Sequence, residues 1–104
     1  MPQFETLTPA QVLVERARPG VKLVDVRTTE EYLEEHIPDS LHLPLQDLPS
    51  LVHVSLAPDD EIIVYCQHGV RSKHAAQFLV TQGFTNVSHM AGGLAVWNGP
   101  VEPE

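Results

Sequence analysis

The stretch IIVYCQHGVRSK, residues 62–73, decides the fold of this chain. Its first four residues are apolar at every position, as in a central strand of a parallel sheet that is buried on both faces. A loop with one glycine follows, and from residue 72 to residue 82 the apolar side chains recur at helical spacing. The order of strand, short loop and helix is typical of an α/β domain. The lone cysteine, Cys66, lies where the strand gives way to the loop.

The segments on either side continue this alternation. Residues 23–26, 41–43 and 87–90 are rich in β-branched or alternating apolar residues and predict strands. Residues 45–55 predict a weak helix or a loop, and a glycine pair leads into a short helix that contains Trp97. We therefore expect one domain over residues 1–104, an α/β fold with a small, mainly parallel β-sheet flanked by helices on both faces.

Two helix starts carry the pattern of a capping box, in which a threonine is followed three residues later by Gln or Glu. Thr8 with Gln11 opens a helix that Pro9 favours at its first position and that a Pro-Gly pair ends. Its expected apolar face consists of Val12, Leu13 and Ala17. The same pattern at Thr28 and Glu31 opens a short second helix.

Composition excludes several classes of protein. The net charge of -8 argues against nucleic acid and against an anionic membrane as partners. No apolar run approaches the roughly 18–20 residues that span a bilayer, and the first residues show no secretory signal pattern. One cysteine forms no internal disulfide, so a reducing, cytoplasmic location is expected.

The charges are unevenly placed along the chain. No Asp or Glu occurs from residue 62 to residue 101, whereas Arg71 and Lys73 both follow Cys66 closely. The sequence therefore predicts a locally cationic patch in an acidic protein, which is the pattern of an anion-binding site. Chance clustering of a few charges is the alternative interpretation.

Cys66 has a setting that favours a reactive thiolate. Backbone N–H groups in the turn and in the first helical turn lack intrahelical partners, so they can converge on an anion, and the helix dipole adds partial positive charge. Gly69 permits the positive φ that such a loop needs. The alternative is a buried cysteine that only fills space in the core. A metal site is disfavoured, because none of the six histidines has ligand spacing beside the cysteine.

The length of the loop separates two chemistries. In cysteine phosphatases the segment between cysteine and arginine is one residue longer than the QHGV segment between Cys66 and Arg71. A smaller ring of amides suits a sulfur atom carried on the cysteine better than a phosphoryl group. The chain has no second cysteine to resolve a mixed disulfide, so a dithiol mechanism is excluded.

Three motifs in order resemble those of single-domain rhodaneses, a family of sulfurtransferases. They are LVDVRTTEEYLEEHIPDSLHLPL (residues 23–45), CQHGVRS (residues 66–72) and QGFTNVSHMAGGLAVW (residues 82–97). The chain departs from the family at Glu35 and Asp39, where glycines are usual. These are turn positions, so the departure concerns local backbone geometry more than chemistry.

The resemblance implies a role for each matching residue. Cys66 is the nucleophile and persulfide carrier, and Asp25 and Arg27 support the active-site edge of the sheet, mainly as a structural pair. The loop residues would bind the transferred sulfur through their amides: Gln67, His68, Gly69, Val70, Arg71 and Ser72. No metal or organic cofactor is implied.

The resemblance also implies the partners, which are a small anionic sulfur donor, such as thiosulfate, and a thiol or a sulfur-acceptor protein. Because the domain is small, we expect Cys66 close to the surface, where such a protein can dock. Two alternatives stay open: a phosphatase or arsenate reductase of related fold, and a non-catalytic rhodanese-like binding module.

Overall fold

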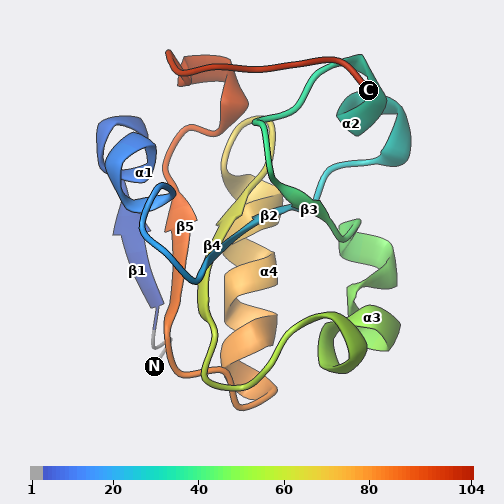
Figure 1. The fold of residues 1–104 in the computed structure, drawn as a ribbon. Helices are drawn as coiled ribbons and strands as arrows, with labels where there is room; N and C mark the ends of the chain where they lie inside the picture. Colours follow the sequence, from blue (N-terminus) through green and yellow to red (C-terminus); the bar gives the residue numbers. More distant parts are fainter. Residues whose placement is uncertain (1–3) are drawn as a thin grey trace.

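Five parallel strands form one sheet in the order β1-β5-β4-β2-β3 in the computed structural model, which describes residues 4–104 (Figure 1). The strands are β1 (Phe4–Leu7), β2 (Val21–Asp25), β3 (Leu41–His42), β4 (Glu61–Tyr65) and β5 (Val87–Met90). All four pairings between neighbours are parallel, and β4 lies at the centre. The predicted parallel sheet is confirmed.

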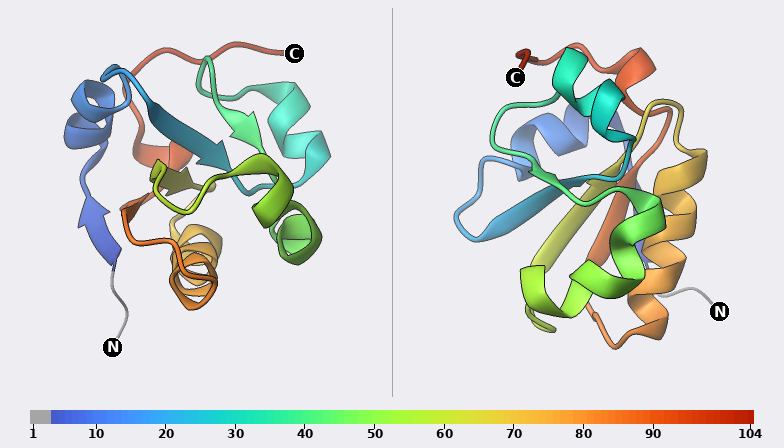
Figure 2. Two further views of the ribbon diagram at one scale, coloured as in Figure 1. Left: turned by 60° about the horizontal axis from the view of Figure 1, so that its bottom comes forward. Right: turned by 90° about the vertical axis from the view of Figure 1, so that its right-hand side faces the viewer.

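Helices cover both faces of this sheet, as predicted. The α-helices are α1 (Pro9–Glu15), α2 (Thr29–Glu34), α3 (Leu48–Ser55) and α4 (Val70–Thr81), and two short 3-10 turns are η1 (Leu45–Asp47) and η2 (Leu94–Val96). Figure 2 shows α3 and α4 on one face and α1 on the other. The α2 helix, the β4–α4 loop and η2 gather at the carboxyl end of the sheet, at the top of Figure 1.

The apolar run of β4 forms both halves of the core because successive strand residues point to opposite faces. Ile62, Val64 and Cys66 belong to the cluster that packs under α3 and α4. Ile63 and Tyr65 belong to a second cluster, on the face that carries α1 and η2. All five side chains are buried, which explains why the run shows no alternation of polar and apolar residues.

Both predicted capping boxes are present. Thr8 Oγ1 accepts the Gln11 N–H at 3.1 Å, and the Gln11 side chain accepts the Thr8 N–H at 2.8 Å. Thr28 and Glu31 form the same pair at α2. The predicted apolar face of α1 is wrong in part. Val12 is buried, but Leu13 is 43% exposed, and the helix ends at Glu15, before Ala17.

One strand and two boundaries differ from the prediction. Strand β1 was not expected, because four residues with half-exposed ends carry little periodicity. Helix α4 begins at Val70 and not at residue 72, so the loop after Cys66 is shorter. Trp97 is the residue that ends η2 and does not lie within it. Of the helices in residues 4–104, none has the length and apolar character that a membrane crossing requires.

Candidate active site

Asp25, Arg27 and Cys66 lie together at the carboxyl edge of the sheet, as the strand order predicts. Asp25 on β2 is the register partner of Tyr65 on β4, so the residues that follow each strand are neighbours. Arg27 Nη1 donates to the side-chain oxygen of Gln67 at 3.2 Å. The end of β2 is thus joined directly to the loop that begins after Cys66.

The loop curls around the sulfur of Cys66. The backbone N–H of Gly69 donates to Sγ at 3.1 Å, and the N–H of Ser72 donates to the same atom at 3.2 Å. Gly69 has φ 98°, the left-handed conformation that favours glycine. Because α4 begins directly after Gly69, the Ser72 amide lies in the first helical turn and has no intrahelical partner. Two backbone dipoles therefore point at one sulfur atom.

Cys66 is only 1% exposed, so the expectation of a cysteine close to the surface is wrong. A second turn packs against the backbone of Cys66 and Gln67. The N–H groups of Leu94 and Ala95 donate to the carbonyl oxygens of Cys66 and Gln67 at 2.9 and 3.0 Å. A Cβ atom on Gly93 would lie 2.5 Å from both of these carbonyl oxygens and from the Gln67 carbonyl carbon. The η2 turn thus packs its backbone directly against the cysteine loop.

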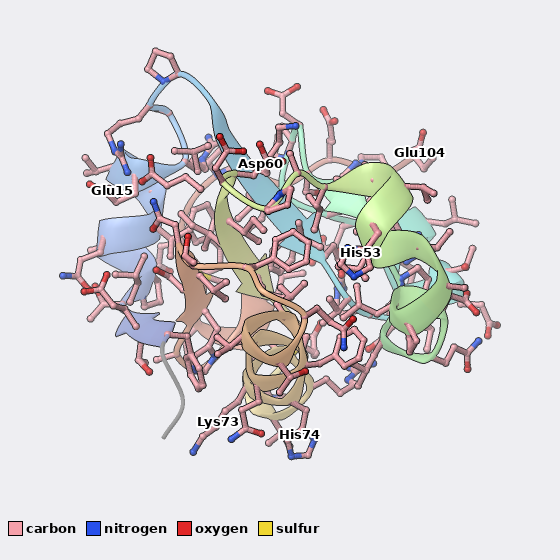
Figure 3. The ribbon with its side chains drawn as sticks, turned by 90° about the horizontal axis from the view of Figure 1, so that it is seen from below. Glu15, His53, Asp60, Lys73, His74 and Glu104 are labelled. Carbon is pink, nitrogen blue, oxygen red and sulfur yellow. The ribbon has the colours of Figure 1, made fainter. Side chains whose placement is uncertain are left out.

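Arg71, one of the two cations of the predicted patch, has a carboxylate partner that the sequence does not predict. Its Nη1 and Nη2 donate to the two carboxylate oxygens of Glu31 on α2 at 2.7 and 3.0 Å. This bidentate pair raises the pKa of Arg71 and lowers the pKa of Glu31 to about 2, mainly through the hydrogen bonds between the two side chains. Figure 3 shows Lys73 and His74 projecting outward from α4, away from the sheet. Of the two predicted cations, Arg71 is therefore paired with a carboxylate and Lys73 points away from the sheet.

Asp25 and Arg27 form a buried ion pair, at 0% and 2% side-chain exposure. Arg27 Nη2 donates to Asp25 Oδ2 at 2.7 Å and to the carbonyl oxygen of Glu35 at 2.6 Å. The backbone N–H of Arg27 donates to Asp25 Oδ1 at 2.9 Å. Burial opposes the charge on Arg27, but the Asp25 carboxylate outweighs it and the pKa of Arg27 is raised. The pair fixes the end of β2 beside Gln67.

The hydroxyl of Ser72 joins the loop to β5. Ser72 Oγ donates to the carbonyl oxygen of Gly69 at 3.2 Å and lies 3.1 Å from Nδ1 of His89. Ser72 and His89 are both buried. Burial, and then the charge of Lys73, lower the pKa of His89. The two residues whose amides reach Cys66 Sγ are thus held by one hydroxyl.

The other loop residues lie farther from the sulfur. Gln67 is half-buried against Arg27, whereas the side chains of His68 and Val70 are exposed. Sequence reasoning assigned Glu31 only to a helix cap and gave His89 no role. The opposite charges of Glu31 and Arg71 were the one feature of the sequence that could have indicated their pairing. Within residues 4–104, no three His, Cys, Asp or Glu side chains gather closely enough to hold a metal ion.

Two clefts open beside the loop, and the Glu31–Arg71 pair lies between them. The first, of about 300 Å³, is lined by Val26, Arg27, Thr28, Thr29, Pro44, Leu45, Gln46 and Arg71. The second, of about 450 Å³, is lined by Arg27, Glu31, Glu34, Glu35 and Gln67. Arg27 lines both clefts, so a small anion in either one meets an arginine that already has a carboxylate partner.

Comparison with known proteins gives matches over almost the whole chain. The sequence pattern of the rhodanese-like domain matches residues 8–100. The thiosulfate sulfurtransferase GlpE of Pseudomonas savastanoi pv. phaseolicola is 35% identical over 104 residues, which cover 100% of this chain and 96% of that protein.

Solved structures match as well. A rhodanese-related protein from Thermoplasma volcanium has a TM-score of 0.86 at 27% identity, covering 96% of this chain and 99% of that one. A protein of unknown function from Rhodopseudomonas palustris, described as a possible tyrosine phosphatase, has a TM-score of 0.82 at 29% identity, covering 95% and 85%.

Proposed function

The chain belongs to the rhodanese-like domain family and is a sulfurtransferase, and we propose that Cys66 carries the transferred sulfur as a persulfide. The observation that carries this proposal is the pair of backbone N–H groups, from Gly69 and Ser72, that donate to Cys66 Sγ. Donors fixed in a buried site stabilise negative charge without reorganising. The thiolate is the form of a cysteine that attacks, and these two donors lie against the atom that carries its charge.

The proposed first half-reaction is a nucleophilic displacement at sulfur. The Cys66 thiolate attacks the outer sulfur of thiosulfate, or of another persulfide donor, and a new S–S bond forms. The bond between that sulfur and the sulfonate sulfur breaks, and its electron pair leaves with sulfite. The outer sulfur keeps its negative charge in the persulfide, and the charge that Cys66 gives up leaves on sulfite. We propose that the amides of residues 67–72 surround this outer sulfur.

In the second half-reaction a thiophilic acceptor attacks the outer sulfur, and the electron pair of the broken S–S bond returns to Cys66. Cyanide, which becomes thiocyanate, is a suitable acceptor in an assay. In the cell we propose a thiol or a sulfur-acceptor protein. Each half-reaction conserves charge and consumes no oxidant or reductant, so the residues of the chain suffice without a cofactor.

We assign Asp25 and Arg27 a positioning role in this reaction. Arg27 is bound by Asp25 on one side and binds Gln67 on the other. It therefore links the end of β2 to the first residue after the nucleophile. We propose that this contact with the Gln67 side chain helps the loop keep its curl when the sulfur changes from thiolate to persulfide.

Intact mass spectrometry tests the proposal. After incubation with thiosulfate, the protein should gain one sulfur atom, and cyanide should remove it. Because Cys66 is the only cysteine, a Cys66→Ser variant should gain none. A wild-type protein that gains sulfur from neither thiosulfate nor an alkyl persulfide contradicts the proposed carrier, and so does a Cys66→Ser variant that turns over at the wild-type rate.

Phosphatase activity is the competing proposal, and the Rhodopseudomonas structure described as a possible tyrosine phosphatase gives it some support. The loop opposes it, since four residues separate Cys66 from Arg71 and Arg71 is bound to Glu31. A phosphoryl group needs an arginine whose two N–H groups can reach its oxygens. We expect no hydrolysis of a phenyl phosphate ester under conditions in which sulfur transfer to cyanide is measurable.

The cytoplasm stays the proposed location. A lone cysteine that cycles between thiolate and persulfide depends on reducing conditions, because oxidation would block the sulfur that must attack. Fractionation of the source cells, followed by detection of the protein with an antibody, tests this proposal. Recovery in an oxidising compartment would contradict it.

A further inference from the structure

Glu31 is held more firmly than a helix cap requires. Its Oε1 accepts the Thr28 N–H at 3.0 Å and lies 3.1 Å from the Thr28 hydroxyl, while both carboxylate oxygens accept from Arg71 at 2.7 and 3.0 Å. The pair is about two-thirds covered, since the Arg71 and Glu31 side chains are 35% and 30% exposed. Because the pKa of Glu31 is lowered to about 2, its carboxylate stays charged at neutral pH.

The arginines at the site have carboxylate partners. Arg27 is bound to Asp25 and Arg71 to Glu31. Of the residues that line the two clefts, these arginines are the only cations among residues 4–104 that the structure describes. Glu34 and Glu35 add further negative charge to the larger cleft, and Lys73 points away from the sheet (Figure 3). A dianion that enters either cleft therefore meets, among residues 4–104, only arginines that already have a carboxylate partner.

We propose that Glu31 determines which sulfur donors the enzyme accepts, by occupying the arginine that a dianionic donor would otherwise bind. Thiosulfate must displace the Glu31 carboxylate from Arg71, or share the guanidinium with it. An alkyl persulfide carries one negative charge, on the sulfur that is transferred, and has no sulfonate for Arg71 to hold. This inference rests on the proposed function and adds that a thiol-borne persulfide is the preferred class of donor.

The variant Glu31→Gln removes the negative charge of this side chain and keeps its size and shape. A glutamine already closes the other capping box of this chain, where Gln11 accepts the Thr8 N–H, so α2 should keep its cap. With Arg71 released, we expect the KM for thiosulfate to fall by about fivefold, the size of effect that one partly exposed ion pair can produce. The kcat/KM for an alkyl persulfide should change by less than about twofold.

Glu30→Gln is the matched control. Glu30 is the preceding residue on α2 and is exposed, and the change removes the same charge without releasing Arg71. Its KM for thiosulfate should stay at the wild-type value. If both variants lower this KM equally, the effect is one of overall charge, and the proposal is overturned. A KM for thiosulfate that rises or stays unchanged in Glu31→Gln also overturns it, because Glu31 would then only position Arg71.

Sulfate gives a second readout that does not depend on thiosulfate chemistry. As an unreactive dianion, it should inhibit turnover of the alkyl persulfide more strongly in Glu31→Gln than in wild type. The added Arg71→Gln change should abolish this gain, and equal inhibition in all three proteins contradicts the proposal. Sulfur loading of Cys66, measured by mass spectrometry, distinguishes failure of the proposed function from failure of the inference about donors. If wild-type protein loads sulfur but Glu31→Gln changes neither the KM for thiosulfate nor the inhibition by sulfate, only the inference about donors is refuted.

Discussion

The hydroxyl of Ser72 lies 3.1 Å from Nδ1 of His89, directly behind the cysteine loop. The same hydroxyl donates to the carbonyl oxygen of Gly69, and the backbone N–H groups of Gly69 and Ser72 are the two that donate to Cys66 Sγ. One buried side chain therefore fixes both amide donors and ties them to β5. The geometry around the sulfur depends on a contact on the far side of the loop.

Replacing Ser72 with alanine should loosen this arrangement. We expect Ser72→Ala to lower the free energy of unfolding by about 1–3 kcal/mol, because a buried histidine nitrogen loses its partner. Alkylation of Cys66 should slow as its two amide donors lose their fixed positions. Urea unfolding followed by the fluorescence of Trp97, the only tryptophan, measures the stability. Ser50→Ala, which removes an exposed hydroxyl bound to Asp47, is the control, and an equal loss in both variants would contradict the prediction.

His89 should make the stability of the protein depend on pH. Burial and Lys73 lower its pKa below the ordinary 6.5. At a pH between the folded and unfolded pKa values of His89, the unfolded chain binds a proton that the folded protein does not bind. Lowering the pH therefore favours unfolding. The stability due to neutral His89 is therefore fully present above pH 6.5 and is lost as the pH falls toward the folded pKa. His89→Asn should flatten this part of the pH profile of urea unfolding.

The exposed His74 supplies the control for this experiment. Because its side chain projects outward from α4 (Figure 3), His74→Asn should give a profile parallel to that of wild type. If the His89→Asn profile is also parallel to wild type, His89 titrates alike in both states and the prediction is wrong.

Alanine substitutions at two glycines with positive φ distinguish the cost of backbone strain from the cost of a steric clash. A Cβ atom on Gly93 (φ 67°) would lie 2.5 Å from the carbonyl oxygens of Cys66 and Gln67, whereas one on Gly83 (φ 96°) would meet nothing within 4 Å. Gly83→Ala should cost only the strain of a left-handed residue, about 1–2 kcal/mol. Gly93→Ala should cost more than about 3 kcal/mol and also slow sulfur loading of Cys66, because the clash pushes the loop backbone away. Equal unfolding midpoints for the two variants would contradict this account.

The parts of the structure that the sequence predicted are those encoded by neighbouring residues. Both capping boxes involve residues three positions apart, and the buried β4 run followed by Gly69 marks one strand and one loop. Asp39, where the family usually has glycine, keeps the left-handed conformation at φ 67°. Aspartate tolerates this conformation better than most residues, so the turn survives the departure from the family pattern.

The parts that could not be predicted depend on contacts between distant segments. Glu31 and Arg71 are forty positions apart, and each had a sufficient local explanation, a helix cap for one and an anion site for the other. His89 lies on an apolar strand and meets Ser72 only because β5 is the neighbour of β4. The packing of the η2 turn on the cysteine loop likewise joins distant residues, and it does so through backbone groups that every residue carries.

The buried pair of Asp25 and Arg27 should show strong coupling in a double-mutant cycle. Asp25→Asn leaves the Arg27 charge buried without its counterion, and Arg27→Met does the same to Asp25, so each should lower the free energy of unfolding by about 3–5 kcal/mol. The double variant carries no unpaired buried charge and should lose clearly less than the sum of the two single variants. Urea unfolding of the four proteins gives the coupling energy. Lys22→Met, which breaks an exposed contact with Asp60 at 3.7 Å, should change little and shows what a surface pair contributes. Losses that simply add would mean that Arg27 acts through Gln67 and Glu35, independently of the carboxylate beside it.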